Sequence, residues 1–164
     1  MTNIREYRPA DDDALMALVQ SLQDHVAALD PLKLNKYGQA FLVGEYIKYL
    51  VDRVSRENGM IYLAEQNDHI VGCIAGVVQQ PQDDLETYAS LDGRIMDLVI
   101  APEHRGNQIG KHLIAALEQH FRAHHCAHVR VECFGYNHGA YKFYAKCGYH
   151  DRSMEMIKKL SKRG

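Results

Sequence analysis

One segment of the sequence, residues 98–111, combines residue types that could bind a phosphate group. It reads LVIAPEHRGNQIGK, an apolar run that ends near a proline and is followed by a glycine turn and an amphipathic helix. The first backbone N–H groups of a helix have no intrahelical partner and lie at the positive end of its dipole, which suits them to a pyrophosphate. Gly106 and Gly110 leave space for close approach, and Arg105 adds a positive charge.

Two other phosphate-binding motifs fit this segment less well. A P-loop requires Gly-x-x-x-x-Gly-Lys-Ser/Thr, but the stretch from Gly106 to Lys111 is one residue short, and His112 stands where the metal-binding hydroxyl should be. A dinucleotide fingerprint requires a glycine spacing that this segment does not have. An ordinary strand–turn–helix connection is the remaining alternative for this segment taken alone.

A second segment supplies an asparagine, several aromatic residues and a basic residue. Residues 132–137 read ECFGYN, and residues 140–149 read AYKFYAKCGY. The RGNQIG of residues 105–110 resembles motif A of the Gcn5-related N-acetyltransferase (GNAT) family, and residues 132–149 resemble its motif B. Motif A has the pattern Arg/Gln-x-x-Gly-x-Gly/Ala, so Gln108 replaces its middle glycine. The resemblance covers residues 94–149.

This resemblance implies transfer of an acetyl group from acetyl-CoA to a primary amine of a small molecule or a protein. The backbone of Leu98, Val99 and Ile100 would pair with the pantetheine arm in a splay between two parallel strands. Asn137 would hold the cofactor arm, and Lys146 would reach the nucleotide. The pyrophosphate would be wrapped by the loop residues Arg105, Gly106, Asn107, Gln108, Ile109, Gly110 and Lys111. The alternative is a non-catalytic acyl-CoA sensor or interaction module on the same fold.

Direct attack of an amine on the thioester needs an acid, a base and donors that polarise the carbonyl. Tyr144 matches the family position of the general acid, and its alternative role is a core tyrosine. Glu132 matches a catalytic glutamate of relatives that modify protein N-termini; a solvated surface carboxylate, with an ordered water as base, is its alternative. Asp97 is a second candidate base, but alternation along the strand places it opposite Leu98, where it could be solvated or structural.

Neither a metal site nor a nucleophilic cysteine is expected. His120 and His124 have a spacing that could bind a metal, but no carboxylate or cysteine completes a convincing set. The four cysteines are widely spaced without a Cys-x-x-Cys pair, so we interpret them as buried free thiols; they are Cys73, Cys126, Cys133 and Cys147.

The elements that must position these residues follow from hydrophobic periodicity. We expect one α/β domain over residues 1–164, with a GNAT-like, mostly antiparallel central sheet that contains a parallel splay and is flanked by helices. The expected strands cover residues 4–8, 60–64, 70–78, 94–101, 129–134 and 149–160. The expected helices cover residues 15–26, 41–54, 106–124 and 138–147, and an exposed connection covers residues 79–93.

Composition limits the other functional classes. The 164 residues are 46% hydrophobic and 24% charged with a net charge of −2, which is typical of a globular protein and offers no basic stripe for nucleic acid. No apolar run is long enough for a membrane span, and the first residues do not resemble a secretion signal, so we expect a cytoplasmic protein. A homodimer could form through an exposed C-terminal strand edge.

The acceptor amine is expected to bind among the first two helices and the C-terminal residues, at about 24–49 and 151–157. Four acidic features could attract a cationic amine such as a polyamine, an aminoglycoside or a lysine. They are Asp24, Asp30, Glu45 and the acidic segment 83–86. The alternative is that these carboxylates only keep the surface soluble.

Overall fold

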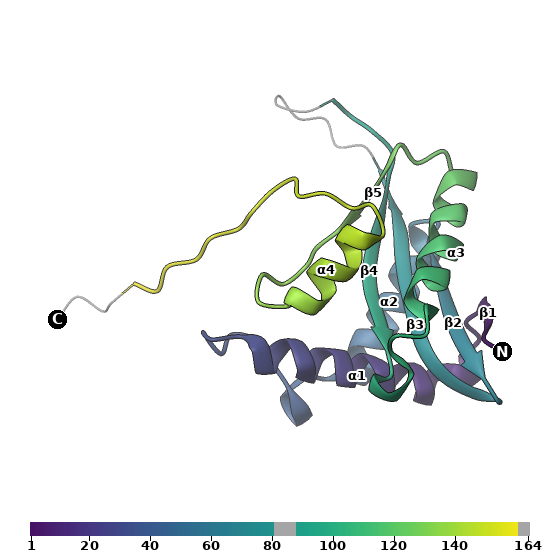
Figure 1. The fold of residues 1–164 in the computed structure, drawn as a ribbon, viewed down its shortest axis with the longest axis horizontal. Helices are drawn as coiled ribbons and strands as arrows, with labels where there is room; N and C mark the ends of the chain where they lie inside the picture. The colour runs from purple at the N-terminus through teal and green to yellow at the C-terminus, as the bar shows by residue number, and fades with distance from the viewer. Residues whose placement is uncertain (81–87, 161–164) are drawn as a thin grey trace.

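The computed structural model describes residues 1–80 and 88–160. A five-stranded sheet with the order β1-β2-β3-β4-β5 runs through the molecule (Figure 1). The first four strands pair antiparallel in succession, and β4 pairs parallel with β5. The expected mixed sheet with a parallel pair is thus confirmed. The strands are β1 (Asn3–Glu6), β2 (Met60–Gln66), β3 (His69–Gln79), β4 (Asp92–Ile100) and β5 (His128–Val131).

Helices cover both faces of this sheet. The longer helices are α1 (Asp12–Leu29), α2 (Val43–Arg56), α3 (Ile109–Ala123) and α4 (His138–Lys146), and single 3-10 turns occur at Pro9–Asp11, Gly38–Ala40 and Pro102–His104. Side chains of α1 and α2 form one hydrophobic core with the sheet, and side chains of α3 form a second core on the other face. Alternate residues of β3 divide between them, since Cys73 joins the first core and Ile74 the second.

The chain packs unusually closely where α3 crosses the sheet near the start of β4. A Cβ atom on Gly93 would lie 2.3 Å from a ring carbon of Phe121, so any larger residue would displace this ring. Phe121 is only 1% exposed and anchors the end of α3 in the second core. Glycine at position 93 therefore sets how closely α3 approaches β4.

The parallel pairing of β4 and β5 is short. It runs from Asp92 opposite His128 to Ile95 opposite Val131, and no pairing between these strands follows in the described residues. The carboxylate of Asp92 accepts hydrogen bonds from Ser90 Oγ at 2.8 Å, His128 Nδ1 at 3.0 Å and Arg130 Nε at 2.5 Å. These bonds join the first residue of β4 to β5 and therefore hold the pair in register.

Helix α3 begins later than the sequence predicts. It starts at Ile109 and not at Gly106, because Gly106 has φ +84° and Gln108, its N-cap residue, has φ +61°. Both values lie in the left-handed region, which interrupts a right-handed helix and which favours glycine. The loop thus uses a left-handed conformation at the position where motif A has its middle glycine.

The predicted C-terminal strand is wrong for this chain on its own. Residues 149–160 form neither strand nor helix, and residues 151–160 run away from the sheet (Figure 1). A β-strand requires a neighbouring strand for its backbone groups, and none of the described strands lies beside this segment. The expected connection over 79–93 also ends earlier, because β4 begins at Asp92; residues 81–87 lie outside the described chain.

Replacing Asp92 tests the register of the parallel pair. Asp92→Asn keeps the shape of the side chain but removes its charge, so the hydrogen bonds from Arg130 and His128 weaken. We expect a loss of about 2 kcal/mol in the free energy of unfolding at pH 7. Urea unfolding followed by circular dichroism measures it, with Asp68→Asn in an exposed turn as the matched control.

The same variant should show a characteristic pH dependence. Burial alone would raise the pKa of Asp92, but hydrogen bonds from Arg130, Ser90 and His128 outweigh it and hold the pKa below its usual range. A depressed native pKa stabilises the fold above the unfolded-state pKa, and this contribution disappears as the pH falls through the native pKa. The difference between wild type and Asp92→Asn should therefore shrink below about pH 4. A constant difference down to pH 2 would contradict the assignment.

Gln108 offers a test of the left-handed turn. Gln108→Gly removes the steric cost of a side chain at φ +61°. We therefore expect the free energy of unfolding to rise by about 0.5–1 kcal/mol. Gly106→Ala should lower stability by a similar amount, since its φ is +84° and its Cβ would meet no neighbouring atom. Gly135→Ala, whose Cβ also meets nothing and whose φ is not positive, is the control. Equal free energies of unfolding for all three variants would contradict the proposed backbone strain at positions 106 and 108.

Candidate active site

The candidate site begins where β4 and β5 separate. Beyond Ile95, β4 pairs only with β3, through Leu98 with Ile74, Val99 with Cys73 and Ile100 with Gly72. The other edge of β4 from residue 96 to 100 therefore presents backbone N–H and C=O groups that have no strand partner among the described residues. An extended ligand can pair with such an edge as an added strand does. The predicted residues Leu98, Val99 and Ile100 all lie in this part of β4, and because backbone groups alternate between the two edges of a strand, only some of their N–H and C=O groups face the open edge.

The loop after β4 presents a group of free backbone N–H donors. From Gly106 to Gly110, none of these N–H groups donates a hydrogen bond to any described residue. Arg105 Nε donates to the carbonyl oxygen of Ile100 at 3.1 Å, and Asn107 Nδ2 donates to the carbonyl of His104 at 3.3 Å. These two bonds hold the loop in shape while its amides stay available. The arrangement suits an anion at the start of α3.

Gly110 has a different role from the one inferred from the sequence. A Cβ atom there would lie 2.9 Å from Cζ of Phe143 on α4, so the missing side chain makes room for this ring. Gly110 is buried in the first turn of α3. Its side-chain position therefore serves the contact between α3 and α4, and only its backbone N–H remains for a ligand.

Helix α4 is positioned by the predicted residue Asn137. Asn137 is its N-cap, and its Oδ1 accepts a hydrogen bond from the backbone N–H of Ala140 at 3.1 Å. The backbone N–H of Asn137 donates to Phe134 at 2.7 Å, which fixes the turn between β5 and α4. The side-chain nitrogen of Asn137 has no partner among the described residues, so it can still donate to a ligand.

Tyr144 projects from α4 into the second hydrophobic core. Its ring contacts those of Phe143 and Tyr149, with centroids 5.5 Å and 5.6 Å away. Burial raises the pKa of Tyr144 above its usual value, and the nearby Cys133 and Asp97 add to this effect. Its hydroxyl makes no hydrogen bond to any described residue, and it is not sealed from solvent. The phenol is therefore protonated at neutral pH and free to act on a ligand.

Asp97 lies in β4 beside an irregularity of the sheet. The register between β3 and β4 shifts at Ala75 and Gly76, opposite Asp97 and Ile95, as in a β-bulge. Bulges often redirect a side chain near a functional site. Tyr46 of α2 donates a hydrogen bond from its hydroxyl to Asp97 Oδ2 at 2.7 Å. Burial raises the pKa of Asp97 although this hydrogen bond acts to lower it.

Asp97 acts electrostatically on Tyr144, whereas Glu132 has a different partner. The charge of Asp97 contributes to the raised pKa of Tyr144, so the two groups interact electrostatically. Glu132 instead accepts a hydrogen bond from Arg94 at 3.0 Å, and its side chain is 79% exposed. The sequence did not reveal the role of Tyr46, because the spacing of apolar residues along a helix does not show which residue of a distant strand a side chain will contact.

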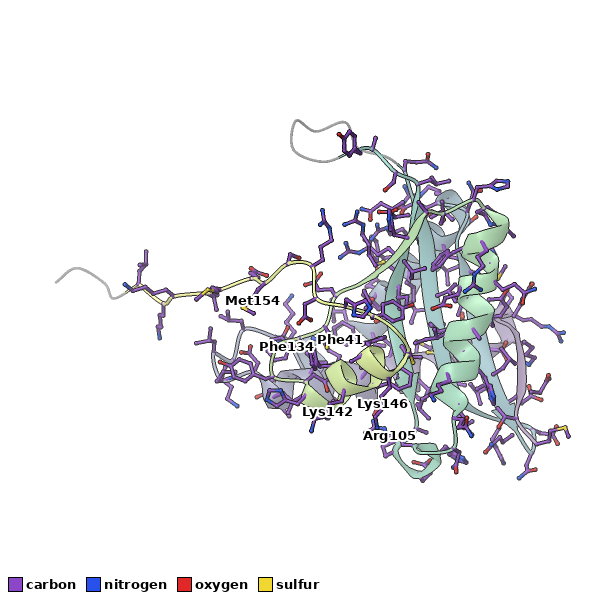
Figure 2. All side chains as sticks on the ribbon, turned by 45° about the horizontal axis from the view of Figure 1, so that its top comes forward. Phe41, Arg105, Phe134, Lys142, Lys146 and Met154 are labelled. Carbon is purple, nitrogen blue, oxygen red and sulfur yellow. The ribbon has the colours of Figure 1, made fainter. Side chains whose placement is uncertain are left out.

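Basic side chains gather at one end of this site. Figure 2 shows Lys142 and Lys146 on α4, on the side where Arg105 lies in the loop before α3. Lys111 in the first turn of α3 is close enough to Cys147 to act on its thiol, although burial is the larger effect and raises the pKa of Cys147. Arg105 and Lys111 stand at the two ends of the segment that carries the free amides, which favours a ligand with negative charge.

The acidic residues proposed to attract an amine are mostly occupied. Asp30 accepts backbone hydrogen bonds from Leu32 at 2.9 Å, Leu34 at 2.6 Å and Asn35 at 3.1 Å, and it shapes the turn after α1. Asp24 accepts from the backbone N–H of Gly38 at 2.8 Å, and Glu45 pairs with Lys48 at 3.1 Å. The acidic segment 83–86 lies outside the described residues. The engaged carboxylates therefore serve the local structure.

The described residues contain neither a helix that could span a membrane nor a cluster of metal ligands. Within residues 1–80 and 88–160, no helix combines the length and apolar character that crossing a membrane requires. No three His, Cys, Asp or Glu side chains in these ranges gather where they could hold a metal ion. The rings of His120 and His124 do stack, with centroids 4.3 Å apart, but each also bonds to a backbone carbonyl.

Known proteins resemble the chain in sequence over part of its length. Glucosamine 6-phosphate N-acetyltransferase from Candida albicans is 34% identical over 65 residues, which is 40% of this chain and 42% of that protein. The protein of the same name from Arabidopsis thaliana is 35% identical over 66 residues, with the same coverage of 40% and 42%. The chain thus spans less than half the length of these curated relatives in the matched regions.

Solved structures resemble the whole fold. A mutant of the BH1408 protein from Bacillus halodurans matches with a TM-score of 0.85 at 17% identity, covering 97% of this chain and 99% of that one. A predicted acetyltransferase with acetyl-CoA from Clostridium acetobutylicum matches with a TM-score of 0.71 at 18% identity, covering 98% and 97%. At such identities the likeness concerns the fold.

The family follows from a separate comparison. The model described as the acetyltransferase (GNAT) family matches residues 26–149, which include the splayed strands, the loop before α3 and α4, but only the last turn of α1. This match covers well over half of the chain and confirms the resemblance drawn from its two motifs. The chain belongs to the acetyltransferase (GNAT) family.

Proposed function

We propose that this protein transfers the acetyl group of acetyl-CoA to a primary amine of a small molecule or a protein. The observation that carries the proposal is the hydroxyl of Tyr144, which has no hydrogen-bond partner among the described residues and is not sealed from solvent. A phenol in this place can protonate a leaving sulfur. The glucosamine 6-phosphate N-acetyltransferases that resemble part of the chain support the same reaction class.

The donor would be bound along one continuous surface. The edge of β4 at Leu98, Val99 and Ile100 would pair with the pantetheine amides, and Asn137 would add a donor from its side-chain nitrogen. The free N–H groups of residues 106–110 and the charges of Arg105 and Lys111 would hold the pyrophosphate. The unpaired amides fit the group chemically, because each is a donor that otherwise lacks a described acceptor. Lys146 would contact the nucleotide end.

The proposed reaction requires a proton donor for the sulfur that leaves when the thioester breaks, and Tyr144 would supply this proton. The raised pKa keeps the phenol protonated before the reaction, and the same buried surroundings raise the proton affinity of a departing thiolate. Tyr144 would therefore donate its proton to the sulfur as the carbon–sulfur bond breaks. Backbone N–H groups near Leu98 to Ile100 would polarise the thioester carbonyl.

Asp97 fits the role of general base better than Glu132 does. Tyr46 occupies only Oδ2 of Asp97, so Oδ1 is free to take a proton from the amine, directly or through a water. The raised pKa of Asp97 also makes it a better proton acceptor than an ordinary carboxylate. Glu132 is exposed and engaged by Arg94, although its catalytic role stays a prediction that mutagenesis can decide.

The acceptor would approach from the side of α1 and α2. Tyr46 of α2 contacts Asp97, so the first helices border the base. All four cysteines are free thiols, which persist in the cytoplasm, and we place the reaction there as part of the proposal. A test panel should include polyamines, aminoglycosides, amino acids, peptides with free N-termini or lysines, and glucosamine 6-phosphate.

Tyr144→Phe provides the first test. We expect it to lower kcat by about a hundredfold or more with the best amine of the panel, because it removes the acid and keeps the ring. The dissociation constant of acetyl-CoA should stay within about twofold. Release of free CoA thiol measures the rate, and calorimetry measures binding. If wild type binds acetyl-CoA but releases no thiol with any amine, the result would contradict the proposed enzyme and favour the acyl-CoA sensor.

A pair of variants identifies the base. Asp97→Asn should lower kcat/KM by about a hundredfold, whereas Glu132→Gln should stay within about threefold of wild type. Since the pKa of Asp97 is raised, wild-type kcat/KM should fall with decreasing pH through a value above the ordinary carboxyl pKa. This acid limb should be absent from Asp97→Asn. The reverse pattern would assign the base to Glu132.

A further inference from the structure

A single hydrogen bond joins α2 to the proposed general base. Tyr46 lies in the first turn of α2, and its hydroxyl donates to Oδ2 of Asp97 in β4 at 2.7 Å. No other described residue donates a hydrogen bond to this carboxylate. The direction in which the carboxylate points therefore depends on Tyr46.

The ring of Tyr46 is held in place by its neighbours. Its centroid lies 5.5 Å from that of Phe41 and 6.2 Å from that of Tyr49, and both rings are tilted relative to it. The ring also packs against the hydrophobic core that α1 and α2 form with the sheet. A hydroxyl on a ring packed in this way has a defined direction, so it can fix the orientation of the carboxylate that accepts its hydrogen bond.

The phenol of Tyr46 acts toward Asp97 only as a donor. Burial raises the pKa of Tyr46 well above its usual value, and the charge of Asp97 and the hydrogen bond to it add to this effect. The hydroxyl therefore keeps its proton throughout the neutral pH range. Tyr46 is thus excluded as a base in its own right, and it affects proton transfer only through Asp97.

Titratable groups from three elements interact electrostatically with Asp97. They are Tyr46 of α2, Cys73 of β3 and Tyr144 of α4. Burial and the charge of Asp97 raise the pKa of Cys73, so this thiol is neutral, as are the two phenols. Burial also raises the pKa of Asp97, whereas the hydrogen bond from Tyr46 lowers it. Among the described residues, Tyr46 is therefore the group that favours the charged carboxylate.

We propose that Tyr46 is a positioning residue for acetyl transfer, whose hydroxyl holds Oδ2 of Asp97 and thereby directs Oδ1 toward the amine that loses a proton. This inference rests on the proposed function, with Asp97 as the general base. A base must lie within hydrogen-bond reach of the proton it takes, and a carboxylate that rotates freely is aligned for only part of the time. Helix α2 therefore both borders the proposed acceptor side and directs the base.

Tyr46→Phe tests the inference because it removes the hydroxyl and keeps the ring. Asp97 then loses the donor that favours its charged form, so the acid limb of kcat/KM should move to higher pH. On this limb we expect kcat/KM to fall by about tenfold, the usual effect of one hydrogen bond to a charged group. Above the limb a loss of about threefold or more should remain, because the carboxylate is no longer aligned. An unmoved limb, or equal rates above it, overturns the positioning role.

Tyr7→Phe is the matched control. The hydroxyl of Tyr7 also donates a hydrogen bond to an aspartate, Asp12 at the start of α1, and its ring packs against the same core. Both variants should keep the fold, as measured by circular dichroism, and both should lose a similar amount of stability toward urea. Only Tyr46→Phe should move the acid limb. A limb that moves equally in Tyr7→Phe would reduce the effect to a general loss of structure and overturn the proposal.

NMR of isotope-labelled aspartate separates this inference from the proposed function. The Cγ resonance of Asp97, identified by its loss in Asp97→Asn, follows protonation of the carboxyl group without any acetyl transfer. Its titration midpoint should lie at higher pH in Tyr46→Phe than in wild type, and equal midpoints overturn the inference whatever the rates show. If the midpoint moves and the kinetic limb does not, Asp97 is not the base, and the role of Tyr46 in catalysis fails with it. Absence of acetyl transfer with every amine would refute the proposed function, and the midpoints would still decide whether Tyr46 controls Asp97.

Discussion

The short parallel contact between β4 and β5 is the constraint on which the rest of the site depends. Asp92 ties the first residue of β4 to Arg130 and His128, and the strands separate after Ile95 and Val131. If the pairing continued, β5 would satisfy the backbone groups of Leu98 to Ile100, and a ligand could not bind there. A contact of this length therefore both holds the two strands and leaves one edge open.

The chain tolerates local strain where a ligand must be bound. Gln108 adopts a left-handed conformation that an ordinary side chain rarely takes, and this keeps a run of amides outside the helix that follows. Asp97 is similarly costly, since burial raises its pKa and disfavours the charged carboxylate at neutral pH. Burial of apolar side chains in the two cores on either side of the sheet offsets the free-energy cost of these groups.

The sequence predicted local turns and caps better than it predicted long-range contacts. Residues 105–110 and the N-cap Asn137 are local signals, because each acts through the backbone of its own turn, and both lie where the motifs placed them. The pairing of Asp97 with Tyr46 joins residues that are far apart in the sequence, and alternation along one strand cannot reveal it. The packing role of Gly110 was also not visible in the sequence, because the ring that occupies the space beside it belongs to Phe143 of another helix. The C-terminal segment has the composition of a strand, but pairing requires an edge, which composition does not describe.

The sheet also separates two sets of side chains that can change independently. Cys73 and Val99 belong to the core shared with α1 and α2, and Ile74 and Leu113 belong to the core shared with α3. A substitution in the first core would reshape α1 and α2, where we propose that the acceptor binds, while the strand backbone between the cores would shield the loop before α3 from it. Selection could thus replace one amine acceptor by another through changes on one face alone. The division of the interior into two layers gives this enzyme fold room to diversify its substrates without rebuilding its chemistry.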